Sequence, residues 1–224
     1  MSHKVHPASY RRKRIQDWES RGFYKDPAKT LEQDFKIRSF LVEKLGRIGV
    51  EKIEIERFPG KLNIIIFSAR PGLIIGRGGE GVEQLRNLLE KKVIEKSGVG
   101  EKSSNQKPKK LELRIEIREV KNPWASASLT AQWVAQQIEK RVPFRRVLKK
   151  ALERIAESRD IKGSRIEVSG RLNGADIARR EWLAKGRLPR QTIRAEIDYA
   201  KANARCSYGT IGVKVWLYKG DKFD

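Results

Sequence analysis

The chain has 224 residues, of which 50 are Lys or Arg and 28 are Asp or Glu, so its formal net charge is +22. This excess is far beyond what solubility needs and indicates a polyanionic partner, nucleic acid first and an anionic membrane second. An anionic membrane is the less favoured of the two partners, and we expect no membrane association. No apolar run approaches the ~20 residues of a spanning helix, and the charge is not confined to one amphipathic helix. The hydrophobic share of 38% still supports a packed core.

The cysteine and histidine content gives no sign of disulfide or metal chemistry. The single cysteine, Cys206, cannot form an internal disulfide, and no cysteine cluster offers a zinc site. His3 and His6 lie in the N-terminal segment, where histidines are more often solvated than metal-bound. The first seven residues lack the apolar core of a signal peptide. We therefore expect a cytoplasmic chain with no metal and no cofactor.

Residues 1–29 are expected to form a basic arm. Pro7 and Pro27 interrupt regular structure, and Arg11-Arg12-Lys13-Arg14 is a cationic run. Aromatic residues alternate with polar ones after this run, which suits nucleic acid, with cations on phosphates and rings on bases or on a protein surface. The alternative, that the rings only fix the arm to its own domain, is equally open. The aromatic residues are Trp18, Phe23 and Tyr24.

Residues 30–121 read as one α+β domain. A helix is expected from Thr30-Leu31-Glu32-Gln33, which has the form of a capping box, to a stop at Gly49. Two strands follow, Val50–Phe58 with alternating polarity and Leu62–Phe67 with a nearly continuous apolar run. The last strand, Leu111–Val120, alternates strictly between apolar and charged residues, so its acids are a solvated strand face rather than a catalytic pair.

A glycine-rich segment, Ile74-Ile75-Gly76-Arg77-Gly78-Gly79-Glu80-Gly81, leads into an expected helix, Val82–Lys96. Unpaired N–H groups at the start of a helix suit a phosphate oxygen. The segment matches both G-x-G-x-x-G, the dinucleotide motif, and G-x-x-G, the loop by which KH domains hold a nucleic-acid backbone. The dinucleotide motif requires a tight turn between strand and glycines. Here Pro71–Ile75 intervenes, which favours the KH interpretation over a dinucleotide site or an ordinary turn.

The order helix, strand, strand, short helix, glycine loop, helix, strand is that of a type II KH domain. The loop glycines allow close approach to a sugar–phosphate chain. Arg77 would supply charge, and Ile74 with Ile75 a floor for bases. The predicted RNA-binding loop comprises Ile75, Gly76, Arg77, Gly78 and Gly79.

Residues 122–224 are expected to form a second two-layer α+β domain, beginning after Asn122-Pro123. Two helices are separated by Pro143. The second presents Phe144, Leu148, Ala151 and Ile155 to the core, and Arg145, Arg146, Lys149 and Lys150 on the other side. Like charges at this spacing repel by ~0.2–0.5 kcal/mol per pair. A polyanion therefore explains the four cations better than a merely solvated face does.

The remaining elements are a strand Ile161–Ser169, a turn Arg171–Gly174, a short helix Ala175–Ala184 and two alternating strands. Helices covering one face of an antiparallel sheet are expected. The closing strands would present Ile193, Ala195, Ile197 and Tyr199 on one face, and Ile211, Val213, Val215 and Leu217 on another.

Several motifs resemble one family over nearly the whole chain, the universal KH-containing ribosomal proteins of the small-subunit head, in their bacterial form. The motifs are Lys4–Pro7, Ala69–Gly72 with the loop after it, Arg141–Arg146, Val168–Ala175, Ile177–Arg179 and Tyr208–Trp216. The resemblance implies a structural component rather than an enzyme, bound to small-subunit ribosomal RNA beside the messenger RNA entry channel. It also implies neighbouring ribosomal proteins as partners, and unwinding of messenger RNA that is not driven by ATP.

By this resemblance Arg145, Arg146 and Lys149, together with Lys150, line the entry channel. The expected ribosomal RNA contacts are Lys4, His6, Arg11, Arg12, Lys13, Arg14, Arg171, Asn173, Arg179, Arg180, Arg187 and Arg190. The loop Gly76–Gly79 lacks the second cation that is common in the family, so a weaker RNA contact is expected there. A free KH-type RNA-processing or assembly factor is the nearest alternative, and a nucleotide-dependent enzyme is the remote one.

Overall fold

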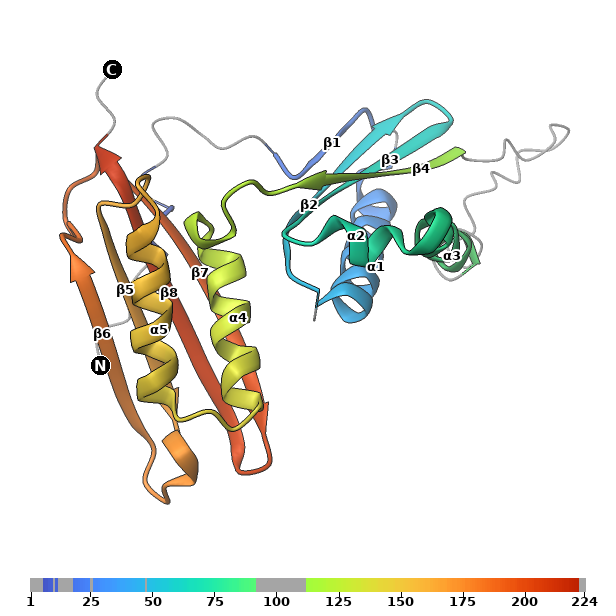
Figure 1. Ribbon diagram of the computed structural model, residues 1–224. Helices are drawn as coiled ribbons and strands as arrows, with labels where there is room; N and C mark the ends of the chain where they lie inside the picture. The colour runs from blue at the N-terminus through green and yellow to red at the C-terminus, as the bar shows by residue number, and fades with distance from the viewer. Residues whose placement is uncertain are drawn as a thin grey trace, which may run out of the picture. The chain divides into compact units, whose positions relative to one another are not determined.

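The computed structural model describes residues 6–9, 11, 18–24, 26–46, 48–91 and 112–221. They divide into two compact units, residues 17–121 and residues 1–16 with 122–224. Each unit combines helices with one four-stranded sheet among the described residues (Figure 1). The expected α+β class is confirmed.

The first unit has a mixed sheet in the order β1-β2-β3-β4, with helices α1, α2 and α3 on one face (Figure 1). β2 and β3 are antiparallel, whereas β1 is parallel to β2 and β4 to β3. The expected order of elements is confirmed, and β1 is an additional edge strand. The elements are β1 (Ser20–Gly22), α1 (Pro27–Leu45), β2 (Val50–Phe58), β3 (Lys61–Ser68), α2 (Pro71–Ile75), the 3-10 helix η1 (Arg77–Gly79), α3 (Glu80–Leu89) and β4 (Glu112–Glu119).

The apolar face of α1 packs on the helix-facing side of the central strands. Ile37 and Leu41 lie in one core cluster with Ile64 and Ile66 of β3. The helix begins earlier than the capping box predicts, because Pro27 fits the first helical turn. The hydroxyl of Thr30 donates to the carbonyl of Asp26 instead of capping the helix.

A buried ion pair fixes the edge of this sheet. Asp34 of α1 accepts hydrogen bonds from Nε of Arg57 on β2 at 2.9 Å and from Oγ of Ser20 on β1 at 2.9 Å. The side chains of Asp34 and Arg57 are 4% and 13% exposed. One carboxylate therefore joins α1, β1 and β2, and its removal would leave the guanidinium charge buried without a partner.

We expect Asp34→Ala to lower the free energy of unfolding of this unit by about 3–5 kcal/mol, because Arg57 then remains buried and unpaired. Urea denaturation and the hydrogen exchange of amides in α1 and β2 measure the effect. Glu32→Ala is the matched control, because its pair with Lys36 is on the surface of the same helix and is worth about 0.5 kcal/mol or less. Equal losses in the two variants would contradict the prediction.

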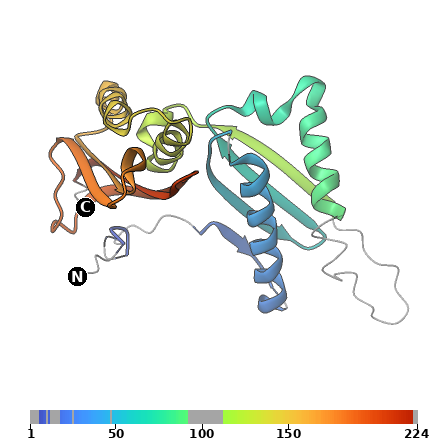
Figure 2. The same cartoon turned by 90° about the horizontal axis from the view of Figure 1, so that it is seen from below.

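The second unit has an antiparallel sheet in the order β6-β5-β8-β7. Helices α4 and α5 cover one face of it (Figure 2). The elements are the 3-10 helix η3 (Pro123–Ala125), α4 (Ala127–Glu139), α5 (Phe144–Glu157), β5 (Gly163–Gly170), the 3-10 turn η4 (Leu172–Gly174), β6 (Arg179–Gly186), β7 (Ala195–Cys206) and β8 (Gly209–Asp221).

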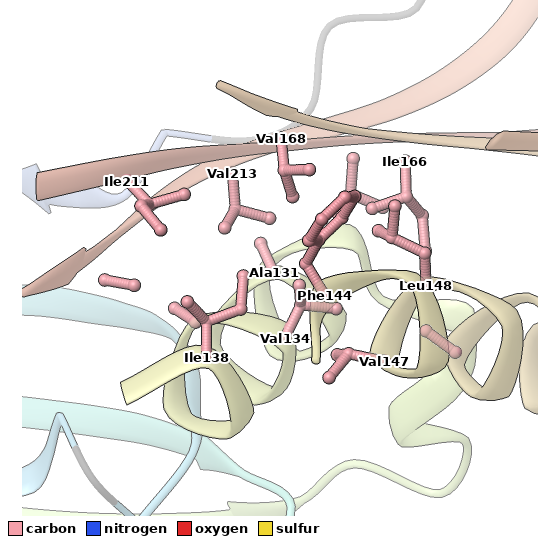
Figure 3. Packing of buried hydrophobic residues seen from close by; sticks show 14 of the residues in the cluster. Ala131, Val134, Ile138, Phe144, Val147, Leu148, Ile166, Val168, Ile211 and Val213 are labelled. Atoms are coloured by element: carbon pink, nitrogen blue, oxygen red, sulfur yellow. The ribbon is translucent and has the colours of Figure 1, made fainter. Parts of the chain in front are cut away.

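The core of this unit lies between the two helices and the sheet. In Figure 3 the side chains of α4 and α5 point toward those of β5 and β8, as with Phe144 and Ile166. The four residues of α5 predicted to face the core are all buried, and so are the four predicted on β8. Alternation in β8 and helical spacing in α5 were therefore sufficient to find this core.

Residues 175–184 do not form the expected helix. Residues 179–186 are strand β6, which pairs with β5 from Gly170↔Arg179 to Gly163↔Gly186. A strand at this position satisfies the N–H and C=O groups along the outer edge of β5, which a short helix would leave unpaired. Tertiary pairing thus overrides the local helical signal.

The expectation that residues 193, 195, 197 and 199 share one face of a strand is also wrong. Ile193 lies outside the strand, and a register shift falls between Glu196 and Ile197. Tyr199 consequently pairs with Trp216 on the sheet face away from the helices. The small residues Ala200, Ala202 and Ala204 lie on the helix-facing side, where Ala204 belongs to the core cluster and the other two pack against it.

Candidate nucleic-acid interface

The G-x-x-G loop has the backbone shape that only glycines adopt readily. Gly76, Gly78 and Gly79 have φ angles of 70°, 60° and 84°, a region in which a Cβ is disfavoured. A Cβ on Gly78 or Gly79 would meet no atom within 4 Å. The loop backbone is therefore open to a ligand between α2 and α3.

Gly81 serves a different purpose, the close packing of α2 on α3. A Cβ there would collide with the carbonyl oxygen of Ile74 and lie 2.9 Å from that of Ile75. The sixth position of the apparent G-x-G-x-x-G motif is thus explained by helix packing, with no need for a dinucleotide.

The two isoleucines before the loop have different environments. Ile74 is 2% exposed and belongs to the core, so it does not provide a floor for bases as expected from the sequence. Ile75 is 39% exposed. Arg77 is exposed and makes no ion pair with the described residues. The accessible part of the loop is therefore one isoleucine, one cation and the glycine backbone.

The basic face of α5 is the second candidate surface. Arg146, Lys149 and Lys150 are exposed and have no ion pair within the described part of the chain. The opposite face of the helix is buried from Phe144 to Ile155. Because that face is packed on the core, the cationic side chains on the other face point into solvent.

Arg145 is joined to strand β6 by a carboxylate. Glu181 accepts a hydrogen bond from Nε of Arg145 at 3.3 Å, and its other carboxylate oxygen forms an ion pair with Nε of Arg179 at 3.0 Å. Because neighbouring residues of a strand point to opposite faces, Arg180 lies on the far side, with a guanidinium nitrogen 3.8 Å from Glu167. Arg179 therefore joins the basic face of α5, whereas Arg180 belongs to another surface.

The described residues before position 12 of the arm contact the C-terminal unit. Arg11 donates from Nε to the carbonyl of Thr192 at 3.2 Å and from Nη2 to that of Arg190 at 2.8 Å. The ring of His6 packs edge-on against Tyr199, with centroids 4.8 Å apart. Both side chains thus have structural contacts within the chain. The other predicted RNA contacts of the arm, Lys4, Arg12, Lys13 and Arg14, lie outside the described residues.

The remaining predicted contacts lie in connections of the second unit. Arg171 donates to the carbonyl of Ala175 at 3.0 Å and to Asp176 at 3.1 Å. Asn173 adopts a left-handed conformation with φ of 55°, which asparagine tolerates. Arg187 and Arg190 lie in the connection between β6 and β7. These residues come from two separate connections of the second unit.

Sequence reasoning missed an aromatic and cationic ladder on the sheet face away from α4 and α5. Arg165, Trp216 and Tyr199 are cross-strand partners on β5, β8 and β7. Burial, with the negative charge of Glu167, raises the pKa of Tyr199. The alternation of inward and outward residues along each strand is the signal that indicates this face. Trp182 was missed because residues 175–184 were expected to form a helix.

The described residues contain no group of three or more His, Cys, Asp or Glu side chains placed to hold a metal ion. None of the described helices has the length and apolar character of a membrane span.

Substitution of Gly78 tests the loop. Asn and Asp both tolerate left-handed backbone and have nearly the same shape, so Gly78→Asn isolates the steric effect and Gly78→Asp adds a charge. We expect Gly78→Asp to bind RNA about fivefold more weakly than Gly78→Asn, from ~1 kcal/mol of repulsion between carboxylate and phosphate. Fluorescence anisotropy with a labelled RNA measures the difference, and equal affinities would remove the loop from the interface.

Comparison with known proteins gives two family matches. The family described as KH domain matches residues 36–125. The family described as ribosomal protein S3, C-terminal domain, matches residues 134–217. A "Small ribosomal subunit protein uS3" of Caldicellulosiruptor saccharolyticus is 47% identical over 99% of this chain and 93% of its own. Proteins of the same name are 43% identical in Synechocystis, over 99% of this chain and 87% of the relative, and in Syntrophobacter fumaroxidans, over 99% of both.

Proposed function

Because the chain belongs to the ribosomal protein S3 family, we propose that it is a structural component of the small ribosomal subunit that binds ribosomal RNA and contacts messenger RNA at its entry channel. The family consists of ribosomal proteins, so the expectation that the chain is not an enzyme is confirmed by membership. Its place of action is the ribosome in the cytoplasm. Other ribosomal proteins of the head and of the entry channel are its proposed neighbours.

The observation that carries the messenger RNA part of the proposal is the basic face of α5. Three exposed cations, Arg146, Lys149 and Lys150, have no ion pair within the described residues. Helix α5 is held by its buried face, so the backbone positions from which these cations project are fixed. A fixed row of cations can hold one phosphate backbone while base pairs separate, and this needs no ATP.

The basic patch also extends beyond the helix. Arg145 and Arg179 share the carboxylate of Glu181, which leaves a net positive charge over the three groups. The side chain of Arg145 is still 71% exposed. We propose that Arg145, Arg146, Lys149 and Lys150 contact messenger RNA, and that Arg179 extends the same surface toward ribosomal RNA.

The ribosomal RNA contacts proposed from the sequence differ in what supports them. Arg171, Asn173, Arg180, Arg187 and Arg190 are exposed or partly exposed polar residues of the second unit. Arg11 and His6 already have partners within the chain. For these two we propose that they hold the arm on its sheet, and so position neighbouring cations for RNA.

A free RNA-processing or assembly factor remains the alternative. It would associate with ribosomes transiently, whereas a structural component cosediments with the small subunit through high salt. Loss of the chain from small subunits in high salt would favour the alternative.

We expect Arg145→Ala combined with Arg146→Ala to impair the unwinding of messenger RNA hairpins while sparing subunit assembly. Single-ribosome translation of a hairpin message measures unwinding, and sucrose-gradient profiles measure assembly. Arg114→Ala with Arg118→Ala is the matched control, because it removes two arginines that lie with Glu116 on a face of mixed charge in the other unit. Normal unwinding in the α5 variant, or equal defects in both, would remove the channel assignment.

The salt dependence of RNA binding offers a second test of α5. Lys149→Ala should reduce the slope of log affinity against log salt by about 0.7–0.9, the contribution of one phosphate contact. Lys36→Ala makes the same chemical change at a lysine paired with Glu32 in the first unit, and should leave the slope unchanged. Identical slopes for wild type and Lys149→Ala would show that Lys149 neutralises no phosphate.

A further inference from the structure

Strand β6 carries an exposed tryptophan, Trp182, and the guanidinium of the buried Arg165 packs against its ring. The guanidinium of Arg165 lies 4.1 Å from the ring centroid of Trp182 and 5.6 Å from that of Trp216. Its Nη2 donates to Glu167 at 3.0 Å, and Arg165 itself is buried. The cation is thus fixed in place and covers one side of the Trp182 ring.

The other side of Trp182 is open. The residue is 51% exposed, although a buried guanidinium lies against it. On the same face of the sheet, the ladder continues from Arg165 toward β7. There the ring centroids of Trp216 and Tyr199 are 5.1 Å apart, and the ring of His6 packs on Tyr199. The arm residue therefore lies at the β7 end of the ladder, and Trp182 at the β6 end remains accessible.

The charges around Trp182 are mostly positive. Arg180 precedes it by two residues on the same strand and hence lies on the same face. Glu167 pairs with Trp182 on one side and with Lys214 on the other. Up to residue 218, Glu167 is the only acid that β5, β6 and β8 place on this face. It is buried, is bonded to Arg165 and lies 3.8 Å from Arg180, whose side chain is still 65% exposed. An exposed ring with neighbouring cations matches a base with its phosphates.

An apolar side chain of a protein neighbour is a poorer match to this surface. It would cover the hydrated heads of Arg180 and Lys214 without offering them an acceptor, and such desolvation is unfavourable. A nucleotide supplies both a π face for the ring and an anionic oxygen for the cations. Stacks of arginine, tryptophan and base also gain from cation–π attraction.

We propose that Trp182, supported by Arg165, is a stacking platform for an unpaired nucleobase of RNA, and that Arg180 and Lys214 contact the flanking phosphates. This inference rests on the proposed RNA-binding function and adds a surface that is separate from both the G-x-x-G loop and the basic face of α5. The surface reads no base edge, so it accepts any base with a free π face.

The test compares two single-stranded probes that differ only in their bases. One is a ten-residue adenylate RNA, and the other carries abasic riboses at its four central positions and keeps every phosphate. Anisotropy titrations of the full chain, at one salt concentration, should show about 5- to 150-fold tighter binding of the intact probe, the usual effect of one stacked base. Trp182→Leu should abolish that preference, and Trp182→Phe should retain part of it.

A matched control separates the platform from general aromatic exposure. Phe35→Leu removes an exposed aromatic ring from α1 in the other unit and should leave the preference intact. Thermal unfolding of each variant checks that the fold is unchanged. All of these substitutions keep the net charge, so the phosphate attraction stays constant.

The outcomes distinguish this inference from the proposed function. A wild-type chain that binds neither probe would overturn RNA binding and the platform together. Equal binding of both probes by the wild type, or a Trp182→Leu variant that keeps the preference, would overturn the platform alone. A Trp182→Leu variant that keeps the preference but fails to enter small subunits would make Trp182 a protein contact instead.

Discussion

Burial of one face of α5 on the antiparallel sheet determines where the charge of the second unit lies. Phe144, Leu148 and Ile155 of the helix are almost fully buried, and this fixes the rotation of the helix about its axis. The cations between them in sequence then have to point outward together. Their mutual repulsion is tolerated because the apolar face contributes far more, about 1.5–3 kcal/mol per buried large side chain.

The glycines of the loop in the first unit have two different structural roles. Gly76, Gly78 and Gly79 take positive φ angles that leave their backbone accessible, whereas Gly81 allows two helices to touch. One short segment therefore combines an open surface with a rigid base. A rigid base matters for binding a flexible polymer, because a loop that is already ordered loses little entropy when RNA binds.

Not every cation of a chain with net charge +22 is available to RNA. Arg57 and Arg165 are buried in ion pairs, and Arg11 is bonded to backbone carbonyls. Arg145 is paired with Glu181 and remains exposed. Net charge identifies the class of partner, but the pairing of each guanidinium decides which surface receives that partner. The basic face of α5 and the open face around Trp182 are therefore the two surfaces of this unit that we propose for RNA.

The sequence by itself determined the class of fold, the order of elements around the glycine loop, and the two faces of α5. These features depend on local periodicity and on glycine conformation, which short segments encode. Only the tertiary structure decided that residues 179–186 form a strand, that Tyr199 turns away from the helices, and that Ile74 is buried. Each depends on hydrogen bonds or packing with residues distant in sequence. The contact of the Arg165 guanidinium with the Trp182 ring depends on the same long-range register of β5 and β6, so no local pattern could place these two side chains together.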